Sequence, residues 1–210
     1  MSSNDIKTLI KIKYKDFRKK YGNKKMPVHI IIPENALIYY ERAQKVKKEF
    51  DKFIYYYIGL NVLYRSLVRR DKSESEKIAI GEFNKKFSKS GKKYYRDIMK
   101  AFKSITDDEI NFLNAYTPLE KKGLKNYGTQ LKTLSENEDK IEALLNKYFD
   151  GIRNQRNMIF HGGIRYQSRK ALRVVNVFNK ISKKILLIFI IWYLENIKRN
   201  DVKTYMPWRS

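Results

Sequence analysis

The sequence contains no cysteine and has only two histidines and four prolines among its 210 residues. Without cysteine the chain cannot form a disulfide, use a thiolate nucleophile or bind zinc through sulfur. A disulfide-stabilised secreted domain is therefore excluded, and we expect a cytoplasmic protein. No Pro-rich or Ser-rich stretch divides the chain and no internal repeat is visible, so the length predicts one domain with an appended arm.

Long hydrophobic runs are also absent. The longest, ILLIFIIWYL over residues 185–194, is much shorter than the ~20 residues that a membrane-spanning helix needs. The N-terminal residues carry charges every few positions, unlike a signal peptide. We therefore expect no membrane partner, and we expect residues 185–194 to form a buried helix.

Acidic residues are scarce relative to basic ones. The chain has 46 Lys and Arg against 22 Asp and Glu, which gives a formal net charge of +24. Such a charge attracts polyanions, and nucleic acid is the commonest, because binding releases the counterions condensed on its phosphates. An acidic membrane surface, or the Lys-rich surface typical of thermophiles, would also account for this balance.

Apolar residues at helical spacing dominate after residue 34 and predict an all-α fold. One helix is expected over 34–69, with Asn61 the only residue on its apolar stripe that is neither apolar nor aromatic. Ser73 with Glu76, and Thr106 with Glu109, have the spacing of capping boxes. Further helices are expected over 138–160, capped by residues 135–137 and ended by Gly162 and Gly163, and over 168–198.

The first 34 residues form a basic arm whose structure is ambiguous. Apolar residues recur there at helical spacing, but residues 10–14 also alternate as in a strand. Residues 28–32, between Pro27 and Pro33, are expected to be a short extended segment. The predicted architecture is a bundle of about five or six helices over residues 35–200, with the arm 1–34, one short strand at most, and a flexible tail 201–210.

Candidate catalytic residues cluster near residue 160, in the segment RNQRNMIFHGG. His161 and Asn157 are four residues apart and share a helix face, whereas Arg156 is offset from His161 by roughly 140°. Cleavage of RNA at a 2'-hydroxyl needs a base, an acid and positive charge at the phosphorus. Histidine serves both proton transfers, and the arginine fork matches two phosphate oxygens. No carboxylate cluster or other metal-ligand set is evident, so we expect no cofactor.

These residues resemble the ribonuclease signature of the HEPN family, an Arg followed by a polar residue and, after a short spacer, by His. RNMIFHGG is similar to the ending of many prokaryotic HEPN domains, and residues 53–64, FIYYYIGLNVLY, are similar to their first long helix. The resemblance covers about residues 35–200. It implies an all-α, usually dimeric domain in which two motifs face each other and form a composite active site.

The resemblance implies a metal-independent endoribonuclease that leaves 2',3'-cyclic phosphate and 5'-hydroxyl ends. His161 would be general acid or base, Arg156 would stabilise the phosphate and transition state, and Asn157 would hold the other two. Arg153 is a candidate phosphate contact or a solvated charge, and Asn61 a substrate-binding or organising residue or a satisfied core amide. By analogy alone, the setting is a toxin or antiviral defence system, CRISPR-associated systems included, with an antitoxin or regulatory protein as a further partner.

Two other functions fit the same residues. A HEPN domain without catalysis would bind nucleic acid or nucleotides, or would be an assembly subunit. A basic protein that coats RNA or DNA would need only the net charge, and His161 would then have no role.

Overall fold

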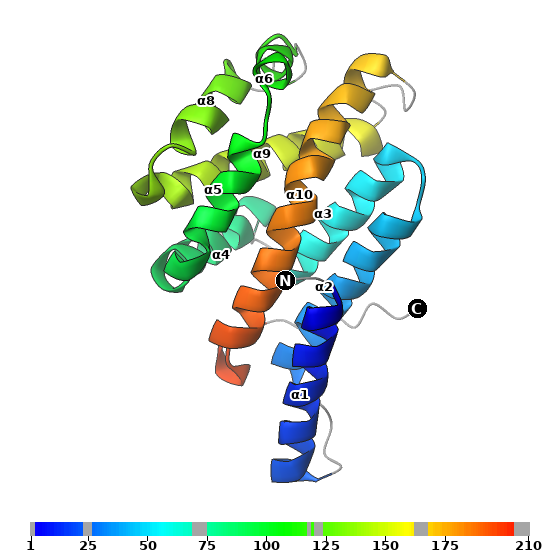
Figure 1. Cartoon of the computed structure of the whole chain (residues 1–210), viewed down its shortest axis with the longest axis vertical. Coiled ribbons are helices and arrows are strands. Elements are labelled where there is room, and N and C mark those ends of the chain that lie inside the picture. The colour runs from blue at the N-terminus through cyan, green and yellow to red at the C-terminus, as the bar shows by residue number, and fades with distance from the viewer. Residues whose placement is uncertain are drawn as a thin grey trace.

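The computed structural model describes residues 3–22, 27–68, 75–116, 119, 124–161 and 168–203. The described residues form nine α-helices and three short 3-10 helices and contain no strand, which confirms the all-α class with more helices than expected (Figure 1). The α-helices are α1 (Ser3–Tyr21), α2 (Val28–Lys45), α3 (Glu49–Arg65), α4 (Glu76–Ser90), α5 (Tyr95–Lys103), α6 (Asp107–Asn114), α8 (Tyr127–Leu134), α9 (Ile141–Phe160) and α10 (Arg169–Asn196). The 3-10 helices are η1 (Lys92–Tyr94), η2 (Glu138–Lys140) and η3 (Arg199–Asp201).

The basic N-terminal segment is helical. Ile6 and Ile10 of α1 are buried, and α1 packs against α2 and α10. The expected extended segment over 28–32 is wrong, because α2 begins at Val28 and continues through Pro33. Burial of apolar side chains on one face of α2 outweighs the hydrogen bond that a proline removes from a helix. The boundary expected at residue 34 therefore lies inside α2.

The single helix expected over 34–69 is in fact two helices. Residues 46–48 separate α2 from α3, and the two helices pack antiparallel, with the rings of Tyr40 and Tyr56 6.0 Å apart. The apolar pattern does not reveal this turn, because Ala43 and Phe50 are seven residues apart, which equals about two helical turns. A break between them leaves the periodicity intact.

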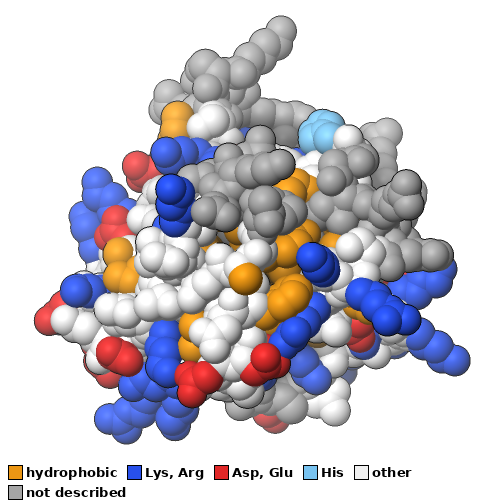
Figure 2. All heavy atoms as spheres, turned by 90° about the horizontal axis from the view of Figure 1, so that it is seen from above, with side chains coloured by type: hydrophobic (Ala, Val, Ile, Leu, Met, Phe, Trp, Pro, Cys, Tyr) orange, Lys and Arg blue, Asp and Glu red, His pale blue; other side chains and the backbone are white. Residues whose placement is uncertain are grey.

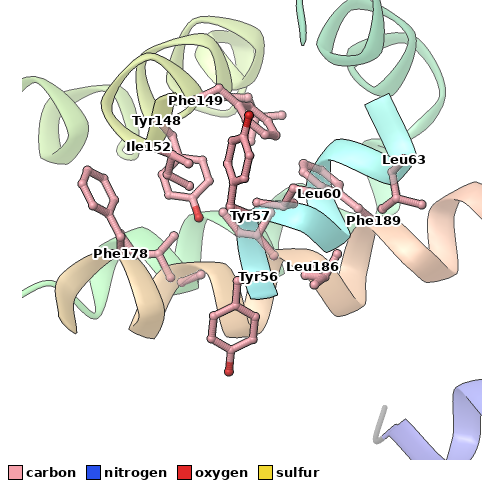
Figure 3. Close-up of a cluster of buried hydrophobic side chains, with 14 of the residues drawn as sticks. Tyr56, Tyr57, Leu60, Leu63, Tyr148, Phe149, Ile152, Phe178, Leu186 and Phe189 are labelled. Carbon is pink, nitrogen blue, oxygen red and sulfur yellow. The ribbon is translucent and has the colours of Figure 1, made fainter. Parts of the chain in front are cut away.

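The long C-terminal helix α10 lies at the centre of the bundle and confirms the helix expected over 168–198. Phe178, Leu186 and Phe189 project from α10 towards side chains of α3 and α9 (Figure 3). The run 185–194 belongs to this buried core, apart from the partly buried residues 187 and 188. In the described part of the chain, no helix is both long and apolar enough to cross a membrane.

Local capping signals mark several helix starts. Thr106 and Glu109 form the expected capping box, with Thr106 N donating to Glu109 Oε2 over 2.7 Å. Asn137 caps η2, which leads directly into α9. Helix α4 begins at Glu76, with the Ser75 side chain as its cap, while Ser73 lies outside the described residues. Gly162 and Gly163, expected to end the preceding helix, and residues 204–210 of the expected tail also lie outside them.

Candidate active site

The last turns of α9 carry all four candidate residues of the motif segment. Arg153, Arg156 and Asn157 lie within the helix, and His161 is the residue that ends it, with its backbone N–H donating to Asn157 O over 2.9 Å. Because the helix is regular up to Phe160, successive side chains are rotated by about 100° around its axis. Adjacent residues of the motif therefore face different surroundings.

Arg156 points inward, towards α3 and α4. Its Nη2 donates to Glu76 Oε2 over 2.5 Å and to the Tyr57 hydroxyl over 2.5 Å, and the guanidinium lies 4.8 Å from the centre of the Tyr57 ring. The Arg156 and Glu76 side chains are 22% and 11% exposed. Glu76 is the first residue of α4, where the helix dipole favours a negative charge. This ion pair is mostly buried and joins three helices.

Two tyrosines of α3 complete the surroundings of Glu76. The hydroxyls of Tyr57 and Tyr64 both donate to Glu76 Oε1. The side-chain amide of Asn61, one helical turn from each tyrosine, donates to the Tyr64 hydroxyl over 2.7 Å and lies 3.4 Å from that of Tyr57. The structure thus connects Asn61 to Arg156 through Tyr57. We refer to Tyr57, Asn61, Tyr64, Glu76 and Arg156 as the Glu76 cluster.

Burial keeps both tyrosines of the Glu76 cluster neutral. Burial raises the pKa of Tyr57, and its hydrogen bond to Glu76 raises the pKa further. Burial and the nearby Tyr57 and Glu76 raise the pKa of Tyr64 well above its ordinary value. Each hydroxyl therefore remains a hydrogen-bond donor to the carboxylate at neutral pH.

The other motif residues make no hydrogen bond or ion pair with this cluster. His161 is exposed, Asn157 is half-buried, and among the described residues neither side chain has a hydrogen-bond partner. Arg153 pairs with Asp150 at 3.4 Å on the same helix. Phe160, directly before His161, is 59% exposed. The structure does not bring Arg156 and His161 of one chain onto a common face.

Sequence reasoning identified Arg156 and Asn61 but missed Tyr57, Tyr64 and Glu76 as parts of one cluster. Glu76 was considered only as a capping residue, and its separation of 80 positions from Arg156 gave no local signal. For the tyrosines a signal existed, because they flank Asn61 at spacings of four and three on one helix face. Within the described residues, no group of three His, Asp or Glu side chains could hold a metal ion.

No family model, curated protein or solved structure matches this chain. The functional argument therefore rests on the motif, the geometry of the Glu76 cluster and the charge of the molecule.

Proposed function

We propose that the protein is a metal-independent endoribonuclease of the HEPN type. The observation that carries this proposal is the end of α9, where a guanidinium fixed by Glu76 and Tyr57 is followed five residues later by the exposed His161. Cleavage at a 2'-hydroxyl requires a base, an acid and positive charge, of which a fixed guanidinium supplies the charge and an accessible imidazole one of the two proton transfers. Lys and Arg side chains around the face seen in Figure 2 add a field that attracts RNA.

In the proposed reaction the 2'-oxygen attacks the adjacent phosphorus and the bond to the 5'-oxygen breaks. A base takes the proton of the 2'-hydroxyl and an acid gives a proton to the leaving 5'-oxygen, and His161 is suited to either role. Arg156 would stabilise the negative charge on the phosphorane. Both of its contacts use Nη2, and Nε is buried without a partner among the described residues, so the donors left for phosphate oxygens are those of Nη1.

The proposed site is completed by a second copy of the chain. Each chain supplies one motif histidine, whereas acid and base act on opposite sides of the phosphate, and Arg156 and His161 of one chain face different directions. Among the described residues, Phe160 is the most exposed large apolar side chain, and it adjoins His161. We propose that it lies in a two-fold interface, for which a stable contact buries on the order of 1,600 Å².

The decisive experiment incubates purified protein with mixed RNA in excess EDTA and analyses the product ends. We expect cleavage to persist and to leave 2',3'-cyclic phosphate, and His161→Ala to lower the rate at least ~100-fold. Asn157→Ala should lower it less. Arg156→Lys is the better arginine variant, because it keeps a charge beside Glu76 and loses only the bidentate fork. Activity lost on chelation and restored by magnesium would contradict the mechanism.

Mixing chains tests the composite site separately. If two motifs act together, excess His161→Ala chains should lower the activity of wild-type chains more than dilution does, because mixed dimers carry half a site. Light scattering that shows only monomers at concentrations where RNA is cleaved would exclude the dimeric site and leave His161 acting alone.

One observation favours a second function, a HEPN-like module that binds nucleic acid or assembles with a partner without catalysis. Arg156 already has a carboxylate partner, and an arginine held in an ion pair is as suited to structure as to chemistry. RNA binding without cleavage by the wild-type chain would support this alternative. A setting in toxin or defence systems, with an antitoxin or regulatory partner, is compatible with both functions.

A further inference from the structure

An open groove runs between α1 and α2 and has a volume of about 930 Å³. Seven residues line it: Lys11, Tyr14, Lys15, Arg18, Lys19, Ile31 and Glu34. The four cations of this set are exposed, and none forms an ion pair with another described residue. We call them the α1 cations.

The α1 cations form a row along one side of the helix. Lys11, Lys15 and Lys19 follow at intervals of four residues, which corresponds to a rise of about 6 Å per step, and Arg18 lies beside the last of them. Like charges at this spacing repel each other and destabilise an isolated helix. A polyanion with regularly repeated phosphates would relieve the repulsion between all of the α1 cations.

The opposite wall of the groove adds little negative charge. Glu34 is the only carboxylate among the lining residues, and the Tyr14 hydroxyl donates to it across the groove. Further along, a smaller hollow includes Glu41, which pairs with Lys7 at 2.6 Å. The groove is therefore most basic towards the C-terminal half of α1.

We propose that this groove binds the phosphate backbone of single-stranded RNA. Tyr14 and Ile31 provide the aromatic and apolar surface on which unpaired bases pack, while the α1 cations contact the phosphates. Helix α1 forms the lower end of the molecule in Figure 1 and α9 crosses its upper half, so this surface is separate from the α9 motif. The proposal concerns binding and stands whether or not the motif cleaves RNA.

An anionic membrane is the alternative partner for a basic helix, and the packing of α1 opposes it. Membrane-surface helices bury an apolar face in the lipid. In α1, Ile6 and Ile10 are already buried within the protein. Ile12 and Tyr21 of α1 are exposed, but they are nine residues apart and lie on opposite sides of the helix, so they form no continuous apolar face for a lipid surface.

The test measures binding to a fluorescent 2'-O-methyl oligouridine of about 20 nucleotides, which is longer than the site of a typical single-strand binding fold and cannot be cleaved at the 2' position. One variant neutralises the α1 cations: K11Q/K15Q/R18Q/K19Q. The matched control removes three lysines and one arginine that are exposed and unpaired among the described residues, on the other side of α10: K85Q/K89Q/K92Q/R96Q.

We expect the α1 variant to bind at least ~10-fold more weakly than the wild-type chain. The slope of the logarithm of its binding constant against the logarithm of the salt concentration should be less steep by about 3, whereas the control should retain the wild-type slope. Equal effects of both variants would show that net charge alone governs binding and would overturn the proposal. So would binding of the wild-type chain to phosphatidylserine vesicles without binding to the oligonucleotide.

A second variant should change the affinity for RNA in the opposite direction, and it removes no cation. Glu34→Gln keeps an oxygen that accepts from Tyr14 but removes the negative charge from the groove, so RNA should bind a few-fold more tightly. Unchanged or weaker binding would mean that phosphates do not lie in this groove. This variant decides the question even if circular dichroism shows that the four-site variant is unfolded.

Discussion

Arg156 and His161 are five residues apart on one helix, yet their surroundings are opposite. Arg156 is held in a mostly buried cluster by a carboxylate and a tyrosine, and His161 is exposed at the helix end without a hydrogen-bonded partner among the described residues. A motif written as a single string thus joins a mostly buried residue to an exposed one.

This difference predicts that the two residues fail in different ways when they are replaced. A buried charge that loses its partner destabilises the fold, because the remaining ion is neither solvated nor paired. An exposed imidazole contributes little to folding, so its removal can affect only function. Replacement of Arg156 should therefore lower the stability of the fold, whereas replacement of His161 should leave it unchanged, although the two residues are only about one and a half turns of α9 apart.

The largest stability effect is expected for Arg156→Ala. Its loss leaves Glu76, whose side chain is 11% exposed, without its cationic partner, and we expect the free energy of unfolding to fall by about 2 to 4 kcal/mol. Urea denaturation followed by circular dichroism measures this change. His161→Ala should stay within about 0.5 kcal/mol of wild type.

A second substitution sharpens this prediction. Adding Glu76→Gln to Arg156→Ala removes the unpaired charge but keeps an acceptor for the two tyrosines, so part of the lost stability should return. If Arg156→Ala alone proves as stable as His161→Ala, the ion pair contributes nothing and the contrast between the two residues fails.

A smaller change in the free energy of unfolding is expected at alkaline pH. The pKa values of Tyr57 and Tyr64 are raised above 10.0 in the folded chain, so their neutral forms stabilise the fold fully below that pH. This contribution is lost as the pH rises from the unfolded pKa through the folded one, because the unfolded chain releases its protons first. The free energy of unfolding of the wild-type chain should therefore fall as the pH rises through this range. In the double variant Tyr57→Phe, Tyr64→Phe this fall should be shallower by about 1 to 2 kcal/mol per pH unit.

Urea denaturation between roughly pH 9 and 11, on either side of the ordinary tyrosine pKa, measures that slope. Tyr21→Phe is the control, since the Tyr21 side chain is 44% exposed and lies outside the Glu76 cluster. A double variant with the wild-type slope would show that other buried tyrosines account for all of the alkaline sensitivity.

The parts of the fold that could be predicted depend on local sequence. Thr106 and Ser168 cap their helices within three residues of the side chain, and the apolar spacing of α10 identifies its buried face. The turn at 46–48 and the helical start at Val28 could not be predicted, because both depend on packing between α2 and α3. Periodicity reports which face is buried but not where the chain reverses.

The same distinction applies to the candidate site. Asn61 was identifiable as a polar residue on an apolar stripe, and Arg156 by its motif. Glu76 lies in another helix, and only tertiary packing places its carboxylate against Arg156. Helical spacing alone separates Arg156 from His161 by roughly 140°, but only the structure shows that Arg156 is held by a mostly buried carboxylate while His161 is exposed.

The smallest effect is expected for Asn61→Ala, and it tests whether Asn61 belongs to the fixed cluster or contacts RNA. Its amide donates to Tyr64 over 2.7 Å, so the loss should lower the free energy of unfolding by about 1 kcal/mol. Because the amide serves the tyrosines, the affinity for the 2'-O-methyl oligonucleotide should change less than about twofold, a difference of under ~0.5 kcal/mol. Asn154→Ala, another half-buried amide without a side-chain partner among the described residues, is the matched control and should change neither quantity. If Asn61→Ala weakened RNA binding strongly while stability was retained, Asn61 would be a substrate contact, and the Glu76 cluster would contact RNA through α3 as well as through Arg156.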